Sequence, residues 1–157
     1  MIRKAVIPAA GLGTRMLPLT KTQPKEMLPL GNKPCIQYIV EELASVGVDQ
    51  ILVITGKKKR AIEDHFDKDM EMHQLLSRSG QNEQLEELQY EDMNIQFFYT
   101  RQSVQAGLGD AVAYAKNFIN GDPFIIALGD SVIHSNENKC LLGKFLVPVT
   151  NLSTIMT

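Results

Sequence analysis

The chain has 157 residues, which fits one domain with a single substantial core. Hydrophobic residues make up 44% and charged residues 22%, an ordinary mixture for a globular protein. A net charge of −2 gives no general basic field for nucleic acid, and no apolar run is long enough to span a membrane. The two cysteines, Cys35 and Cys140, lack zinc-site spacing, and no secretory signal is visible, so we expect a reduced, cytoplasmic protein.

Short apolar runs recur along the chain and predict buried strands. They are rich in Ile, Val and Phe, which is typical of parallel strands covered on both faces. The runs occupy residues 4–8, 51–55, 95–99 and 124–128.

Helical patterns fill the segments between these runs. Helices are predicted from about Pro34 to Val46, from near Lys59, and over residues 108–119, the last ending at Gly121. The basic run 57–60 is expected to be a solvated helical turn, and the charged residues 67–92 an excursion over the surface.

This alternation predicts an α/β fold, a Rossmann-like doubly wound sheet that is mostly parallel. Ligands bind such sheets beyond the carboxyl ends of the strands. The loops after residues 8, 55, 101 and 128 are therefore expected to carry the chemistry.

The segment after the first run has the composition of a phosphate-binding loop. Residues 11–29 read GLGTRMLPLTKTQPKEMLP, and Gly11 and Gly13 would let backbone N–H groups approach an anion closely. Arg15 supplies a planar fork suited to phosphate oxygens, and Lys25 a mobile point charge. Neither the third glycine of a dinucleotide fingerprint nor the Gly-Lys-Ser/Thr of a Walker A loop is present.

Two later segments complete the candidate site. Gln102 follows the third run, and its amide offers a donor and an acceptor that match a pyrimidine edge. Gly107 would let the backbone approach the same base or sugar. Asp130 follows the fourth run, where a carboxylate is well placed to hold Mg²⁺. His65, His73 and His134 have no metal-ligand spacing and are expected to have local structural roles.

Residues 11–29 resemble the signature of the sugar-1-phosphate nucleotidylyltransferases, GxGTRxxPxTxxxPKxMLP, with every fixed position present. The bacterial UTP–glucose-1-phosphate uridylyltransferases are the members most similar to the chain. The shared segments are Lys33-Pro34, residues 36–42, residues 55–57 and residues 60–67, and the likeness covers about residues 3–134.

The resemblance implies transfer of UMP from UTP to glucose 1-phosphate, giving UDP-glucose and pyrophosphate with Mg²⁺ as cofactor. It implies that Arg15 binds the β- and γ-phosphates, Lys25 the α-phosphate, and Asp130 the metal as one of two carboxylates. The nucleoside would be bound through the backbone of Ala9, Ala10 and Gly11, with the base against Gln102 and Gly107. Glu26 is expected to orient Lys25 or to contact the nucleoside.

Two positions depart from the family pattern. Ser131 stands where the most similar members often carry a second Asp, and Asp110 where they commonly carry His. The choice between UTP and dTTP, and the choice of sugar phosphate, therefore stay open. An acidic residue is absent from the end of the second run, Ile54-Thr55-Gly56, which disfavours a dinucleotide-dependent oxidoreductase.

Family members are considerably longer, and their remaining portion supplies the second metal carboxylate, the glucose contacts and usually an oligomer interface. We therefore expect residues 1–157 to be a truncated, N-terminal nucleotide-binding portion of a homo-oligomeric enzyme. A module that binds nucleotide without turnover is the alternative. A further helix over residues 139–149 and a β-like run over residues 153–157 are also predicted.

Overall fold

The computed structural model describes residues 2–132. The predicted elements at residues 139–149 and 153–157, together with His134 and Cys140, lie outside this part of the chain. Within it, no helix is long and apolar enough to cross a membrane.

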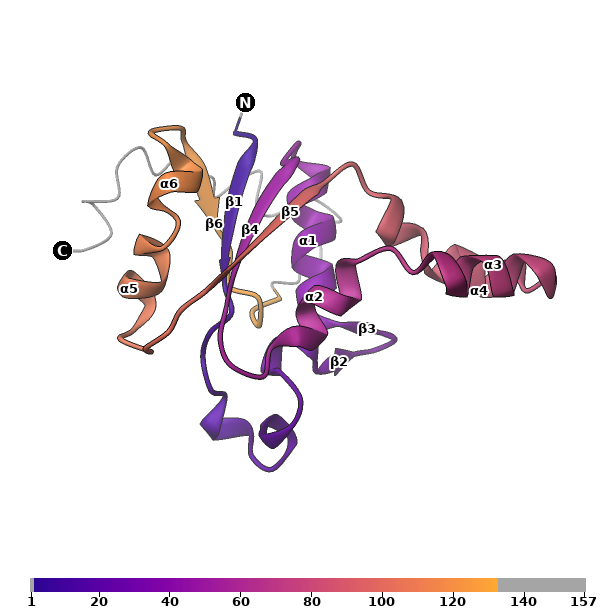
Figure 1. Cartoon of the computed structure of the whole chain (residues 1–157), viewed down its shortest axis with the longest axis horizontal. Helices are drawn as coiled ribbons and strands as arrows, with labels where there is room; N and C mark the ends of the chain where they lie inside the picture. The colour runs from indigo at the N-terminus through magenta and orange to yellow at the C-terminus, as the bar shows by residue number, and fades with distance from the viewer. Residues whose placement is uncertain (1, 133–157) are drawn as a thin grey trace.

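A parallel sheet of four strands forms the centre of the molecule, in the order β5-β4-β1-β6 (Figure 1). The strands are β1 (Lys4–Pro8), β4 (Gln50–Thr55), β5 (Gln96–Arg101) and β6 (Phe124–Ile126). All three strand pairs are parallel. The predicted α/β fold is confirmed.

The order of the strands reverses at β1, which predicts a ligand crevice beyond the carboxyl ends of β1 and β6. The chain runs outward from β1 to β4 and β5, then returns to pair β6 with the other side of β1. Lys4 accordingly pairs in register with both Gln50 and Phe124. Open α/β sheets bind ligands at the carboxyl side of such a reversal.

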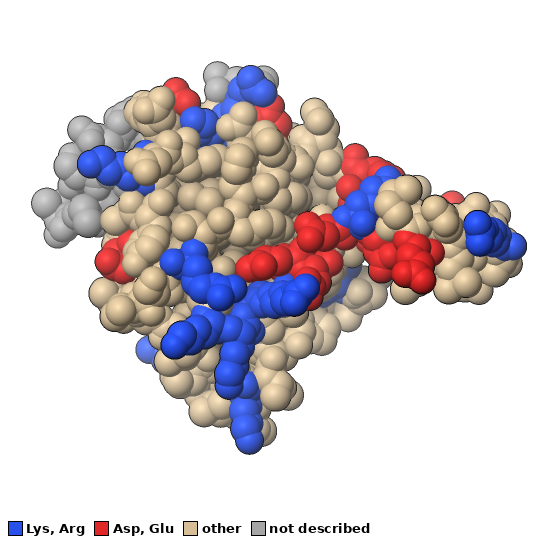
Figure 2. Space-filling model, in the orientation of Figure 1, with Lys and Arg blue, Asp and Glu red and all other residues tan. Residues whose placement is uncertain are grey.

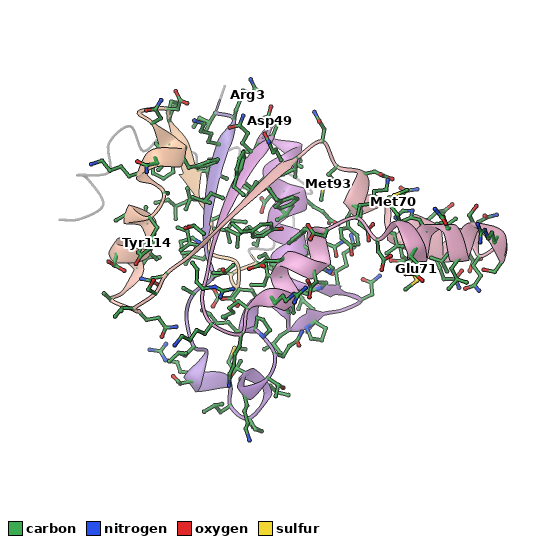
Figure 3. All side chains as sticks on the ribbon, viewed as in Figure 1. Arg3, Asp49, Met70, Glu71, Met93 and Tyr114 are labelled. Carbon is green, nitrogen blue, oxygen red and sulfur yellow. The ribbon has the colours of Figure 1, made fainter. Side chains whose placement is uncertain are left out.

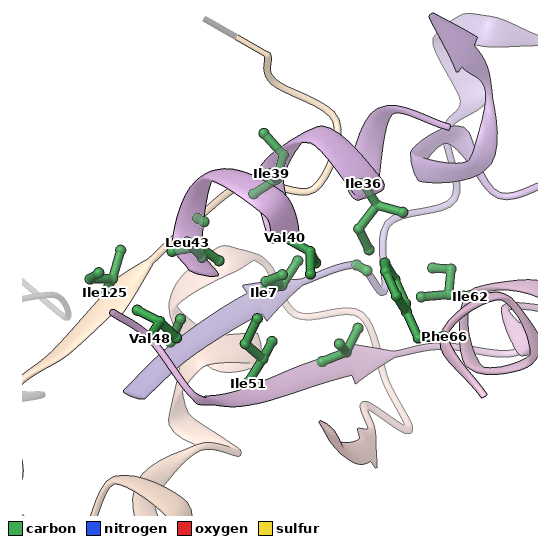
Figure 4. Close-up of a cluster of buried hydrophobic side chains, with 14 residues drawn as sticks. Ile7, Ile36, Ile39, Val40, Leu43, Val48, Ile51, Ile62, Phe66 and Ile125 are labelled. Atoms are coloured by element: carbon green, nitrogen blue, oxygen red, sulfur yellow. The ribbon is translucent and has the colours of Figure 1, made fainter. Parts of the chain in front are cut away.

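Helices cover both faces of the sheet. The first face is covered by α1 (Cys35–Ser45) and α2 (Arg60–Phe66), the second by α5 (Leu108–Ala113) and α6 (Lys116–Ile119). Successive side chains of a strand point to opposite faces of the sheet, so each strand contributes to both layers. Ile7 packs under α1, whereas Val6 packs under α5. Figure 4 shows the first layer, in which the Ile and Val side chains of β1 and β4 meet those of α1.

The single helix predicted over residues 108–119 is two short helices. The N–H groups of Tyr114 and Ala115 donate to carbonyls three residues back, so the end of α5 tightens and the chain restarts as α6. The prediction was wrong here because the apolar stripe continues across the break: Ala115 and Ile119 are as buried as Ala111.

Residues 67–92 form an arm that projects from the body (Figure 1). It contains α3 (Met70–Arg78), α4 (Asn82–Glu87) and the 3₁₀ helix η4 (Gln89–Asp92). An ion pair from Lys68 to Asp92 and a side-chain contact from His73 to Glu91 connect α3 and its N-terminal side to η4. Met70 and Glu71 are labelled on this arm in Figure 3.

The segment between β1 and α1 contains short elements that the sequence did not predict. They are the 3₁₀ helices η1 (Thr14–Met16), η2 (Leu19–Lys21) and η3 (Lys25–Met27), and the antiparallel pair β2 (Pro29–Leu30) and β3 (Lys33–Pro34). Together they connect the carboxyl end of β1 to the start of α1.

Candidate functional site

A cleft of about 370 Å³ opens at the carboxyl end of the sheet. The loops after β1, β5 and β6 line it, together with η3 and the start of α5. Six of the residues predicted for the site line this cleft: Ala10, Gly11, Lys25, Gln102, Gly107 and Asp130. Segments far apart in sequence are thus brought to the place that the strand order favours.

Lys25 and Asp130, which both line the cleft, form an ion pair. Lys25 Nζ donates to Asp130 Oδ2 at 2.5 Å, and the two residues are 105 positions apart in sequence. Both side chains keep contact with solvent, at 24% and 32% exposure. Each group can therefore exchange its partner for one brought by a ligand.

Glu26, the neighbour of Lys25, takes part in a different and buried ion pair. Its Oε2 accepts from Lys59 Nζ at 2.7 Å, and the side chains are only 1% and 7% exposed. One expectation is corrected by this pair: the basic run 57–60 is not wholly solvated, because Lys59 is buried. The carboxylate of Glu26 is bonded to Lys59, and the expectation that Glu26 contacts the nucleoside stays a prediction.

Close packing fixes the loops that meet above this pair. A Cβ on Gly129 would lie 3.1 Å from Ile7 Cγ2 and 3.2 Å from Glu26 Cγ. A Cβ on Gly56 would lie 3.0 Å from the carbonyl oxygen of Ala10. A side chain at either glycine would therefore force the neighbouring atoms of these loops to shift.

Arg15 and Gly13 lie outside the cleft lining. Arg15 is exposed on η1, so its phosphate contact stays a prediction. Gly13 has φ 68°, and a Cβ there would meet Thr20 Cγ2 at 2.9 Å. The turn itself therefore requires this glycine. Figure 2 shows Lys and Arg side chains gathered at the lower part of this face, where the loop after β1 and the start of α2 lie in Figure 1.

Two glutamines from the loop after β5 also line the cleft. Gln102 is 5% exposed, and its backbone N–H donates to the carbonyl of Thr55 at 2.9 Å. Gln105 Nε2 donates to the carbonyl of Ala10 at 2.6 Å, joining the loops after β5 and β1. Gln105 was not predicted as a site residue, although it follows Gln102 by three positions in the same loop.

Ala9 lies below the cleft and does not line it. The residue is fully buried, and its N–H donates to the carbonyl of Ile54 at 2.8 Å. Its N–H is therefore committed to the sheet and is not free for a nucleoside.

The two described histidines make contacts with nearby side chains. His65 stacks on Tyr90 with ring centroids 4.7 Å apart, and its Nε2 lies 3.1 Å from Gln37 Oε1. Burial lowers the pKa of His65, and the charge of Glu91 opposes this shift. His73 pairs with Glu91 in the arm.

Comparison with known proteins identifies the chain. The nucleotidyl transferase family, as described by its sequence profile, matches residues 4–146. The chain belongs to the nucleotidyl transferase family.

Curated members of this family are similar over most of the chain. A UTP–glucose-1-phosphate uridylyltransferase of Staphylococcus epidermidis is 53% identical over 135 residues, which is 86% of this chain and 47% of that protein. A second such protein, from Staphylococcus saprophyticus, is 52% identical over 136 residues, 87% of this chain and 47% of that protein. The chain thus spans about half the length of the curated relatives it matches.

Solved structures show the same fold. The UTP-bound enzyme of Acinetobacter baumannii superposes with a TM-score of 0.82 at 37% identity, covering 87% of this chain and 48% of that one. A UDP-glucose pyrophosphorylase complexed with UDP-glucose gives 0.78 at 35% identity, covering 100% and 54%.

The donor set of this nucleotidyl transferase fits a single-carboxylate contact to Mg²⁺. The carboxylate of Asp130, a hard oxygen ligand, lines the cleft. One of its oxygens accepts a hydrogen bond from the cationic side chain of Lys25. No group of three or more His, Cys, Asp or Glu side chains that could hold a metal occurs among residues 2–132. Oxygens from the nucleotide would therefore have to complete the shell.

Proposed function

We propose that this chain is the nucleotide-binding portion of an enzyme that transfers UMP from UTP to glucose 1-phosphate. The observation that carries the proposal is the cleft at the strand reversal, where Lys25 and Asp130 face each other beside Gln102 and Gly107. The names of the relatives support uridylyl transfer, and one structural neighbour is UTP-bound. A free Cys35 is in keeping with a reduced, cytoplasmic location.

In the proposed reaction an oxygen of the sugar phosphate attacks the α-phosphorus in line, and pyrophosphate leaves on the opposite side. Catalysis then consists of positioning and of neutralising phosphate charge. Lys25 turns from Asp130 to the α-phosphate, and its charge stabilises the transition state. Arg15, on the exposed η1, binds the departing β- and γ-phosphates.

Asp130 would hold Mg²⁺ together with phosphate oxygens. When bound, the ion supplies positive charge against the triphosphate. In this scheme the ion pair between Lys25 and Asp130 holds both side chains in place until the nucleotide binds and separates them.

Pyrophosphate release from UTP, with and without glucose 1-phosphate, tests the proposal directly. In a whole enzyme that contains this portion, we expect release only when the sugar phosphate is present. Residues 1–157 alone are expected to bind UTP without measurable release. Parallel assays with dTTP and with other sugar 1-phosphates decide the specificity. A whole protein that binds UTP without turnover would be a nucleotide-binding module, and failure of residues 1–157 to bind any nucleotide would overturn the proposal.

Gln102→Ala is expected to weaken discrimination between bases more than it weakens phosphate binding. The Gln102 side chain lines the cleft, and a site built to pair with one base edge rejects another by leaving polar groups unpaired. We expect roughly tenfold loss of the preference for UTP over ATP. Competition binding with UTP, dTTP and ATP measures it, and an unchanged order of preference would remove Gln102 from the base site.

A further inference from the structure

The side-chain amide of Gln102 is held in one orientation by its neighbours. Gln102 Nε2 donates to Asp110 Oδ2 at 2.6 Å and to the carbonyl oxygen of Gly107 at 3.4 Å. A carbonyl and an ionised carboxylate both accept hydrogen bonds and cannot donate them. A flipped amide would place Oε1 against these two oxygens, so the nitrogen has to face them.

This orientation uses both hydrogens of Nε2 inside the protein. Oε1 is left as the only polar atom of the side chain that has no hydrogen bond from the described residues. Gln102 is 5% exposed and lines the cleft, so the free oxygen belongs to a buried side chain at the edge of the ligand space. Oε1 is not among the buried atoms that lack a partner, so it reaches the cleft and is open to a ligand that donates to it.

Asp110 comes from a different element than Gln102. It lies in the first turn of α5, and Gly107 precedes that helix with φ 106°, a conformation that favours glycine. The Gly107 carbonyl also accepts the N–H of Ala111, the first bond of the helix. The start of α5 is thereby fixed relative to β5, and the carboxylate of Asp110 is positioned on the amide.

We propose that Asp110 is a positioning residue for base specificity: it locks Gln102 as a hydrogen-bond acceptor, so that the cleft selects a base with a ring N–H donor. The inference rests on the proposed function and extends it. Uracil and thymine carry a hydrogen on N3 and satisfy Oε1 directly. Cytosine has a lone pair on N3, which would face the lone pairs of Oε1 unless the ring shifts to present its amine.

Binding of UTP and CTP, each with Mg²⁺, to the 157-residue chain tests this role. In Asp110→Ala the amide is free to turn, so we expect the ratio of UTP to CTP affinity to fall about tenfold. Asp110→Asn is the matched control: it removes the charge but keeps an oxygen that accepts from Nε2. That variant is expected to retain the ratio within about threefold.

A double-variant comparison separates the positioning of Gln102 by Asp110 from a general effect of Asp110 on α5. If Asp110 acts through Gln102, then Asp110→Ala makes no further change to the ratio in a Gln102→Ala background. Thermal unfolding checks that each variant is folded. Asp110→Ser, whose side chain is one atom shorter, replaces Asp110→Ala if that variant does not fold.

The role of Asp110 is overturned if Asp110→Ala keeps the wild-type ratio, if Asp110→Asn loses as much as Asp110→Ala, or if the effect persists without Gln102. In each of these cases UTP still binds and the proposed function stands. Failure of the wild-type chain to bind any nucleotide would overturn both.

Discussion

Lys25 and Glu26 are neighbours in sequence, yet each forms an ion pair with a very different environment. Glu26 and Lys59 are shielded from water beneath the loops, whereas Lys25 and Asp130 face the cleft. A buried pair cannot lose one member without leaving an uncompensated charge, while a solvated pair can separate at little cost. The difference indicates that one pair holds the loops and the other is built to be exchanged.

Breaking the buried pair is expected to have the largest effect. Lys59→Ala would leave the buried Glu26 carboxylate without a hydrogen-bond partner among residues 2–132, and we expect a loss of about 3–5 kcal/mol in the free energy of unfolding. Urea unfolding at neutral pH measures it. Lys33→Ala, which breaks the half-exposed pair with Glu41, is the control, with an expected loss below about 1 kcal/mol. Equal losses in the two variants would show that burial does not distinguish the pairs.

Lys25→Ala should have the opposite effect to Lys59→Ala: a large loss of activity with little change in stability. In a whole enzyme that contains this portion, we expect turnover to fall at least about 100-fold, roughly 3 kcal/mol of transition-state stabilisation, while the free energy of unfolding changes by less than about 1 kcal/mol. Initial rates of pyrophosphate release, together with a melting curve, test both halves. Lys116→Ala, on the exposed face of α6, should leave rates unchanged. Wild-type rates in Lys25→Ala would remove this lysine from catalysis.

Asp130→Asn tests the other member of the solvent-exposed pair, the partner of Lys25. An amide is a weaker ligand for Mg²⁺ than a carboxylate, so we expect the Mg²⁺ concentration for half-maximal UTP binding to rise about tenfold. UTP titrations at a series of Mg²⁺ concentrations measure this. Asp122→Asn is the control, because Asp122 pairs with Lys4 outside the cleft lining. Identical Mg²⁺ dependence in both variants would argue against a metal role for Asp130.

The smallest effect is expected from a group that belongs to neither pair. Burial holds the pKa of His65 below its ordinary value of 6.5, so below that pH the unfolded chain binds the proton more readily. The stability that neutral His65 contributes is present above pH 6.5 and is lost as the pH falls. We expect less than about 1 kcal/mol between pH 7 and pH 5, since solvent screens the half-buried ring. Urea unfolding of the wild-type chain and of His65→Gln at both pH values isolates the contribution of His65. Equal pH dependence of the two free energies of unfolding would contradict a lowered pKa for His65.

The sequence predicted the sheet well because its strands are buried on both faces and read as apolar runs. It also predicted which loops meet, since parallel strands end at one edge of the sheet. It did not predict the inward turn of Lys59, which stands in a run of four basic residues of which the other three are exposed. Its partner Glu26 is 33 positions away, and no local pattern encodes such a contact.

The roles of the glutamines show the same limit. Gln102 could be singled out because it follows a strand, but the commitment of its nitrogen to Asp110 depends on how α5 lies against β5. Gln105 has no pattern that separates it from a surface residue, and its bond to Ala10 emerges only from the packed loops. Donor and acceptor geometry therefore had to come from the structure.

The projecting arm offers a practical attachment point. The turn between α3 and α4 contains Gly80 with φ 68°, and an added Cβ there would meet no atom within 4 Å. Exposed turns of this kind tolerate inserted segments far better than packed loops do. A fluorophore or short epitope placed after Gln81 would therefore allow the protein to be immobilised or followed by fluorescence with the nucleotide cleft left accessible.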